Sequence, residues 1–388
     1  MRVLMVSDVY FPRVNGVSTA IQTYRESLAA CGIEVSLVAP DYGNECEESW
    51  IRRVVSRKMP LDPEDRLVRW DPLKVAVDAA IAQGCDLIHI QTPFFAHYAG
   101  LAAARKAGIP VIATYHTLFE EYLQFYAPFL PASWLRSLAR KFSRSQCNDL
   151  NAVIVPSHAI HQRLLDYGVT APMHLLPTGV PVEQFDGIGR HAFRERYGIA
   201  QDRPVALYVG RVAHEKNIEF LLDMIDLARV SMPEILLLIT GEGPALNALR
   251  KVATERGLNS HVQFLGYLDR RTELPDCYAA ADVFVFASRT ETQGLVLLEA
   301  MAAGLPVVAL GIMGTIDILG AHRGALVPKD DPADFAGVML DLLRNPDLLA
   351  RLAREGREYA NEWSDRGLAE RMAALYRRVV QEAQECVA

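Results

Sequence analysis

The chain has 388 residues, of which 51% are hydrophobic, and carries 40 Lys and Arg against 47 Asp and Glu. This length supports two hydrophobic cores of ordinary size. The net charge of −7 argues against a nucleic-acid partner, because tracking a phosphate backbone requires a basic surface. The six cysteines are scattered without a CxxC pair, which indicates reduced thiols rather than disulfides or zinc ligands.

Short β-branched runs alternate with helix-length segments along the whole chain. Nearly continuous apolar strands in this alternation are typical of parallel sheets covered on both faces. The strands predicted in the first half are 3–7, 34–40, 86–90, 110–114, 152–156 and 173–177. Those predicted in the second half are 205–210, 234–241, 262–266, 282–288, 306–310 and 324–328.

The alternation pauses at 177–190, a stretch rich in Gly and Pro that we interpret as a linker. The sequence therefore predicts an α/β protein with two doubly wound, Rossmann-like domains facing across a cleft. We expect the first to span 1–183 and the second 184–363, with a last helix at 364–388 that joins the first domain.

One stretch, 295–314, is apolar apart from Glu299 and has about the length that a membrane span needs. Gly304 and Pro306 interrupt it, and a carboxylate in hydrocarbon is costly, so a buried helix followed by a buried strand is the better interpretation. The first residues reach Asp8 after too few apolar positions for a signal peptide. We expect a cytoplasmic protein that lies at most on the inner face of a membrane.

Ligands of open α/β sheets bind beyond the carboxyl ends of the strands, so the loops after strands are the places to search. In the first domain, the loop 8–19 surrounds Gly16, which either admits a phosphate or sugar against the backbone or makes a turn. His116 follows the strand at 110–114. Taken alone, it fits a core histidine better than a catalytic one.

Aromatic residues are dense after His116, and a basic segment follows them. The aromatic run is typical of a core, with a sugar- or lipid-binding wall as the functional alternative; it comprises Phe119, Tyr122, Phe125, Tyr126 and Phe129. The segment 134–144 holds four cations and no acid beside Trp134, Leu135 and Leu138. Such a basic amphipathic helix either binds an anionic membrane, here through residues 129–147, or presents an ordinary solvated face.

In the second domain, Arg211 and Lys216 lie in one loop after the strand at 205–210 and can flank a polyanion. A solvated loop is the alternative. The next strand leads into Gly-Glu-Gly-Pro at 241–244, which begins like a dinucleotide fingerprint, but Leu246 stands where the third glycine belongs. A structural tight turn explains these glycines equally well.

Two acids eight positions apart, Glu291 and Glu299, bracket the start of another predicted helix at Gly294 and Leu295. The free N–H groups of a helix start form a ready anion site. A carboxylate only accepts hydrogen bonds and so suits the vicinal hydroxyls of a sugar. Because apolar neighbours cover most of this helix, we expect Glu299 to be buried with a partner.

Together these residues resemble the retaining glycosyltransferases of family 4, which have the two-domain GT-B fold. The most specific marker is a Glu, seven residues, a second Glu and then Ala-Met-Ala-x-Gly-x-Pro-Val-Val at 291–308, supported by Gly-Arg-x-x-x-Glu-Lys-Asn at 210–217. In the first domain, PRVNGVST, TYHT and CNDLNAVIVPS resemble the branch that glycosylates membrane lipids, including glucosyl-diacylglycerol synthases.

The resemblance implies roles at the matched positions. Glu299 would bind the nucleotide ribose, and Glu291 the donor sugar. The backbone around Gly294 and Leu295, with Arg211 and Lys216, would hold the diphosphate. The catalytic group would be His116, Glu291, Arg211 and Lys216. The donor site would comprise Gly16, Arg211, Lys216, Gly241, Glu242, Tyr267, Glu291, Thr292, Gln293, Gly294, Leu295 and Glu299, and the acceptor site Phe94, Phe119 and Tyr122.

Gln293 departs from the Phe that many members carry before the glycine, and it leaves the choice of hexose open. The chain contains no DxD and no HxxxH, so we expect no metal and no tightly bound cofactor at the active site. The cations and a helix start would then neutralise the leaving diphosphate.

The expected reaction is a metal-independent, front-face transfer of a hexose from a UDP-sugar, with UDP-glucose as the first candidate, to a diacylglycerol or membrane glycolipid. The expected partners are thus a nucleotide-sugar donor, a lipid or glycan acceptor and an anionic membrane surface. The alternatives are transfer to a polysaccharide or small molecule, a sugar-nucleotide epimerase, a dinucleotide-dependent oxidoreductase and a non-catalytic binding protein.

Overall fold

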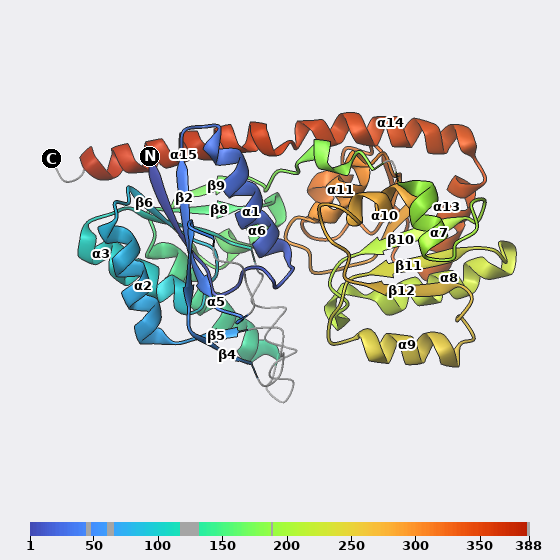
Figure 1. Ribbon diagram of the computed structural model, residues 1–388, viewed down its shortest axis with the longest axis horizontal. Coiled ribbons are helices and arrows are strands. Elements are labelled where there is room, and N and C mark those ends of the chain that lie inside the picture. The colour runs from blue at the N-terminus through green and yellow to red at the C-terminus, as the bar shows by residue number, and fades with distance from the viewer. Residues whose placement is uncertain (44–47, 60–65, 117–131, 188, 386–388) are drawn as a thin grey trace. The chain divides into compact units, whose positions relative to one another are not determined.

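The computed structural model describes residues 1–43, 48–59, 66–116, 132–187 and 189–385. The chain divides into two compact units (Figure 1): unit 1 comprises Met1–Gly179 and Asp365–Ala388, and unit 2 comprises Val180–Ser364. Each unit contains one parallel sheet between layers of helices, which confirms the predicted α/β class with two Rossmann-like sheets.

The sheet of unit 1 has seven parallel strands in the order β3-β2-β1-β6-β7-β8-β9. All six strands predicted for the first half are present. They are β1 (Arg2–Val6), β2 (Glu34–Pro40), β6 (Leu87–Ile90), β7 (Val111–Thr114), β8 (Ala152–Val155) and β9 (Met173–Leu175). The edge strand β3 (Ile51–Val54) and the hairpin of β4 (Ser56–Lys58) and β5 (Arg66–Val68) were not predicted. Their frequent cations interrupt any apolar run.

The helices of unit 1 cover both faces of this sheet. One core joins the sheet to α1 (Gly16–Ala29) and to the last helix, α15 (Asp365–Glu385), whose stripe of Leu368, Met372, Leu375 and Val379 is buried. The helices α2 (Trp70–Ala82) and α3 (Phe95–Ala107) pack against each other and against β1. The remaining described helices are α5 (Ala132–Asn148) and α6 (His158–Asp166).

The sheet of unit 2 has six parallel strands in the order β12-β11-β10-β13-β14-β15, and all six were predicted. They are β10 (Val205–Val209), β11 (Leu236–Thr240), β12 (Val262–Gly266), β13 (Val283–Phe286), β14 (Val307–Ala309) and β15 (Ala325–Leu326). The α-helices around them are α7 (Arg190–Arg196), α8 (Ile218–Ser231), α9 (Leu246–Glu255), α10 (Leu274–Ala280), α11 (Leu295–Ala302), α12 (Thr315–Leu319), α13 (Pro332–Leu343) and α14 (Pro346–Glu362). Two short 3-10 turns, η1 (Val182–Phe185) and η2 (His214–Lys216), complete this unit.

The apolar stretch 295–314 forms a buried helix and a buried strand, as predicted. Its first part is α11 and its second part contains β14, and both belong to the core of unit 2. Within the described ranges, no helix has both the length and the apolar character needed to cross a bilayer.

A buried histidine links three elements of unit 1. His89 in β6 has no exposed surface. Its Nδ1 lies 2.7 Å from the hydroxyl of Tyr376 in α15, and its Nε2 lies 2.7 Å from the Thr114 hydroxyl in β7. Burial, with a smaller effect of His116, lowers the pKa of His89 to about 3. The imidazole is therefore neutral in the folded protein at pH values where the unfolded chain protonates it.

We expect His89→Gln to reduce the acid sensitivity of unit 1. Between pH 6.5 and pH 4 the unfolded chain binds the His89 proton and the folded protein does not, so stability falls as the pH falls, by about 1.4 kcal/mol per pH unit. The substitution removes this slope while costing stability at pH 7. Urea-dependent hydrogen exchange of β6 peptides measures the effect. The exposed His158→Gln is the control, and an unchanged slope in His89→Gln would contradict the assignment.

Candidate active site

The candidate site of unit 2 lies where the strand order reverses. Strand β10 is flanked by β11 on one side and β13 on the other, so the loops after β10 and β13 leave the sheet in opposite directions. This switch point is the usual ligand site of open α/β sheets. The loop after β10 carries Arg211 and Lys216, and the loop after β13 carries Glu291.

An ion pair joins these two loops. The Lys216 ammonium donates a hydrogen bond of 2.6 Å to Glu291 Oε1, and 16% and 18% of the two side chains are exposed. Arg211 faces Glu215, with 3.7 Å between Nη1 and Oε1. Both cations predicted from the sequence, Arg211 and Lys216, therefore lie in the loop after β10, and each has an acidic partner. Glu215 was not predicted, although it lies four residues after Arg211, a spacing that allows such a pair.

The backbone between Glu291 and α11 forms a tight turn. Gly294 has a φ of 95° and precedes the first helical residue, Leu295, and no side chain caps the helix. A neighbouring loop braces the turn, because the Gly314 N–H donates to the Glu291 carbonyl at 2.9 Å. A β-carbon on Gly314 would lie only 2.1 Å from the Thr292 carbonyl oxygen. The preceding side chain, Gln293, is buried with 5% exposed surface.

The loop after β11 packs directly on the loop after β10. Gly241 and Gly243 have φ angles of 123° and 155°. A β-carbon on Gly241 would lie 2.0 Å from the Gly210 carbonyl oxygen, and one on Gly243 would lie 2.4 Å from the Val212 carbonyl oxygen. The Val212 N–H donates to the Glu242 carbonyl at 2.8 Å. Close backbone approach by itself therefore requires glycine at both positions.

Glu299 is buried with 1% exposed surface and has two partners. The Tyr278 hydroxyl of α10 donates to its Oε2 at 3.0 Å, and Arg270 pairs with its Oε1. The prediction of a buried, partnered acid is confirmed. The partners themselves were not predicted. Arg270 lies in the loop between β12 and α10, and Tyr278 lies in α10, so both are distant from Glu299 in the sequence. Tyr267, which begins that loop after β12, is 40% exposed.

In unit 1 the strand order reverses between β1 and β6, and His116 follows the next strand, β7. His116 Nε2 lies 2.9 Å from Gln91 Oε1; because an amide oxygen only accepts, Nε2 carries the hydrogen. Burial lowers the pKa of His116 to about 4. The ring is therefore neutral at pH 7. Gln91 was not predicted, though it directly follows the predicted strand 86–90.

Asp8 at the end of β1 holds the start of α3. The Thr92 hydroxyl donates to its Oδ2 at 2.7 Å, and the Ala96 N–H donates to Oδ1 at 3.1 Å. Burial raises the pKa of Asp8 to about 6 although these hydrogen bonds oppose the shift. Phe94, just before α3, is 54% exposed. The sequence analysis did not predict a role for Asp8. Its hydrogen bonds hold the segment between β6 and the first turn of α3.

Gly16 is the first residue of α1. The helix is capped by Asn15, whose side chain accepts from the Ser18 N–H at 2.8 Å. A β-carbon on Gly16 would meet no described atom within 4 Å. In contrast to Gly241, packing among the described residues gives no reason for a glycine at this position.

The described part of the basic segment, α5, is amphipathic. Trp134 and Leu138 are 73% and 59% exposed, one turn apart, and Lys141 is exposed on the next turn. Arg140 lies over the Tyr167 ring, with its Cζ 5.6 Å from the centroid. Two acceptor residues of the sequence analysis, Phe119 and Tyr122, and residues 129–131 of the proposed membrane segment lie outside the described residues.

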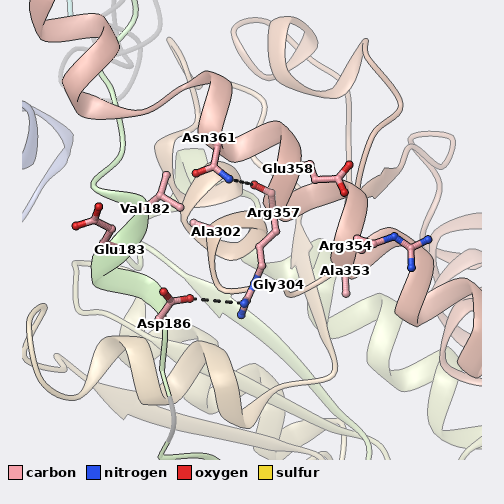
Figure 2. A pocket seen from close by; sticks show the side chains of 10 residues that line it. All are labelled: Val182, Glu183, Asp186, Ala302, Gly304, Ala353, Arg354, Arg357, Glu358 and Asn361. Carbon is pink, nitrogen blue, oxygen red and sulfur yellow. Dashed lines mark hydrogen bonds and ion pairs between the residues drawn. The ribbon is translucent and has the colours of Figure 1, made fainter.

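Figure 2 shows a separate cavity of about 580 Å³ in unit 2. Arg357 projects into it toward Asp186 at 3.6 Å, and its Nη2 donates to the Ala303 carbonyl at 3.2 Å. None of the predicted donor residues lines this cavity. Arg357 joins the start of unit 2 to the C-terminal end of α11. Its contacts with Asp186 and Ala303 therefore stabilise the fold, and no ligand is needed to explain them.

No cluster of three or more His, Cys, Asp or Glu with metal-binding geometry occurs among the residues that the structure describes.

We expect Gly241→Ala to destabilise unit 2 more than Gly257→Ala. Both glycines have positive φ, but a β-carbon on Gly257 would meet nothing within 4 Å. The difference of about 1–3 kcal/mol should appear in thermal unfolding of the two variants. Equal losses would mean that the backbone contact with Gly210 is not close.

Comparison with known proteins identifies the family. A model of the glycosyl transferases group 1 matches residues 189–359, and a glycosyltransferase family 4 model matches residues 14–184. The chain is 32% identical over 360 residues to the alpha-monoglucosyldiacylglycerol synthase of Streptococcus pneumoniae, covering 90% of this chain and 80% of that protein. It is 29% identical over 383 residues to a GDP-mannose-dependent alpha-mannosyltransferase of Mycobacterium tuberculosis, covering 93% and 90%.

Solved structures support the same fold. Sucrose-phosphate synthase from Thermosynechococcus elongatus superimposes with a TM-score of 0.82 at 24% identity, covering 98% of this chain and 99% of that one. Anabaena HepE in complex with UDP-glucose gives a TM-score of 0.76 at 18% identity, covering 96% and 98%. The chain therefore belongs to the glycosyltransferases of family 4, with the GT-B fold, and matches their glycolipid glucosyltransferase branch.

Proposed function

We propose that this glycosyltransferase transfers glucose from UDP-glucose to a hydroxyl of diacylglycerol or of a membrane glycolipid, with retention of anomeric configuration. The observation that carries the proposal is the Lys216–Glu291 ion pair at the switch point of unit 2, beside the uncapped start of α11. The name of the S. pneumoniae relative supports diacylglycerol as the class of acceptor, and the HepE complex with UDP-glucose supports a UDP-sugar as the class of donor.

The loops of unit 2 provide the groups that a nucleotide sugar needs. Arg211 and Lys216 would exchange part of their contact with Glu215 and Glu291 for the diphosphate, helped by the N–H groups at Gly294 and Leu295. Glu291, released from Lys216, would accept hydrogen bonds from the sugar hydroxyls. Glu299 would accept hydrogen bonds from the ribose hydroxyls of the nucleotide. The remaining contacts in the proposed donor site come from Gly241, Glu242, Tyr267, Thr292 and Gln293.

The proposed chemistry is front-face transfer without a metal. The acceptor oxygen bonds to the anomeric carbon on the face from which the nucleoside diphosphate departs, and the leaving phosphate oxygen takes the acceptor proton. Arg211, Lys216 and the helix start stabilise the charge that develops on this phosphate, which is where preorganised donors are most effective.

Residues of unit 1 complete the proposal. The neutral His116 would accept a hydrogen bond from a hydroxyl of the transferred sugar, and the open space at Gly16 would admit the donor phosphate. For the acceptor we propose Phe94, Phe119 and Tyr122, of which the exposed Phe94 lies among the described residues.

A GDP-mannose donor is the second candidate, because the M. tuberculosis relative uses it by name. Gln293, beside the proposed sugar position, would then take part in the choice of hexose. Parallel assays with UDP-glucose and GDP-mannose separate the two donors.

We expect Glu291→Ala, Arg211→Ala and Lys216→Ala to lower transfer by on the order of 100-fold, the usual loss when one group stabilising the transition state is removed. The assay follows labelled glucose from UDP-glucose into diacylglycerol, with product mass. Lys251→Ala, an exposed cation in the middle of α9, should keep full activity. Equal turnover in all five proteins would refute the site, and turnover of donor without acceptor would favour an epimerase.

We also propose that α5 binds an anionic membrane surface, through Trp134 and Leu138 with the neighbouring cations. Changing Arg140, Lys141 and Arg144 to Glu should weaken co-sedimentation with phosphatidylglycerol vesicles by on the order of 100-fold, since each cation contributes about 1 kcal/mol near such a surface. The matched control changes Arg250, Lys251 and Lys329 to Glu; Arg250 also lies over an aromatic ring, Phe264. Unchanged binding of the α5 variant would remove this proposal.

A further inference from the structure

The buried carboxylate of Glu299 is covered from one side by Arg270. Only 2% of the Glu299 side chain is exposed, whereas 23% of the Arg270 side chain is. Tyr278, the other partner, is completely buried. Of the two groups that hold Glu299, Arg270 is thus the one that stands between the carboxylate and solvent.

The backbone that carries Arg270 is fixed by its own hydrogen bonds. The Asp269 carboxylate accepts from the Thr272 N–H at 2.8 Å and from the Thr272 hydroxyl at 2.7 Å. The Glu273 N–H donates to the Asp269 carbonyl at 3.0 Å. Access to Glu299 therefore depends on rotation of the Arg270 side chain rather than on opening of the turn.

A second contact holds the guanidinium in its covering position. Arg270 Cζ lies 5.8 Å from the centre of the buried Phe185 ring in η1. The side chain thus has a cation–π contact on one side and a charged hydrogen bond to Glu299 on the other. Displacing it means giving up both contacts.

A ligand hydroxyl that donates to Glu299 must compete with this arrangement. A carboxylate has lone pairs enough for several donors, but with 2% exposure the Glu299 oxygens offer no room to a ribose while Arg270 covers them. Tyr278 can keep its bond to Oε2 throughout, since its side chain in α10 is completely buried and does not lie between the carboxylate and solvent.

We propose that Arg270 determines how strongly this enzyme recognises the ribose of its donor, by competing with the 2′- and 3′-hydroxyls for Glu299. This inference rests on the proposed role of Glu299 as the ribose-binding acid. In the unliganded protein Arg270 neutralises the buried carboxylate, and on binding the ribose hydroxyls replace it as hydrogen-bond donors to Oε1. The ribose contacts consequently contribute less to affinity than an uncovered carboxylate would allow.

The test measures binding of UDP and of 2′,3′-dideoxy-UDP to the full chain by titration calorimetry at pH 8, with GDP and 2′,3′-dideoxy-GDP run in parallel. The ratio of the two dissociation constants reports the preference for ribose hydroxyls. Arg270→Met keeps an unbranched apolar stem beside Phe185 and removes the competing charge. We expect it to raise the ratio at least about fivefold, because the hydroxyls no longer displace an ion pair.

The matched control is Arg271→Met, the exposed arginine next to it on the same turn, which should leave the ratio as it is in the unmodified chain. Arg270→Gln, which can still donate one hydrogen bond to Glu299, covers the case in which the Met variant does not fold, and a smaller rise is expected. A ratio that is unchanged in the Arg270 variants, with both ligands weakened equally, would show a purely structural role. A lower ratio would show that Arg270 itself binds the ribose, and either result overturns the inference.

Glu299→Gln separates this inference from the function on which it rests. If the unmodified chain prefers UDP over the dideoxy compound and Glu299→Gln abolishes the preference, the ribose assignment holds, and only the Arg270 variants decide the competition. If UDP and the dideoxy compound bind equally well, both to the unmodified chain and to Glu299→Gln, then Glu299 does not bind the ribose. In that case the proposed role of Glu299 is wrong, independently of the Arg270 variants.

Discussion

The ion pair between Lys216 and Glu291 joins two loops that are 75 residues apart in the sequence. It forms because parallel strands deliver their carboxyl ends to one edge of the sheet, and because β10 and β13 are neighbours there. The rest of the site is arranged around it. Gly314 braces the Glu291 turn from one side, and the glycines of the β11 loop rest on the β10 loop from the other.

The charges that the candidate site of unit 2 contributes are paired in the unliganded structure. Lys216 has Glu291, Arg211 has Glu215, and Glu299 has Arg270. Pairing keeps partly buried cations and acids stable. A donor bound here as proposed would have to exchange partners with these ion pairs, because the charges are already in contact with one another. On the proposed function, the affinity for a nucleotide sugar would be a difference between two sets of ion pairs and hydrogen bonds, so both members of each pair would influence it.

The sequence was sufficient to predict twelve of the described strands and most loops that carry candidate residues, because apolar runs and helix-length spacers are local signals. It was sufficient to predict that Glu299 is buried, since the neighbouring residues of its helix are apolar. It was not sufficient to predict Arg270, Tyr278 or Gln91 as partners, because those contacts depend on which loops the sheet brings together. The edge strand β3 was missed for a related reason: at the edge of a sheet, arginines can point to solvent and no apolar run is needed.

The two units differ in the kind of recognition that they can offer. The paired cations Arg211 and Lys216 belong to unit 2 and suit an anionic diphosphate. In unit 1 the loop after β7 presents His116, which its low pKa keeps neutral at pH 7, and the Asp8 carboxylate after β1 is held by Thr92 and the start of α3. A neutral imidazole can bond to a hydroxyl without attracting a phosphate, so this position of unit 1 differs in chemistry from the cationic loop of unit 2. This difference follows from side chains at the ends of a few strands, so one architecture repeated twice can carry different chemistry in its two copies.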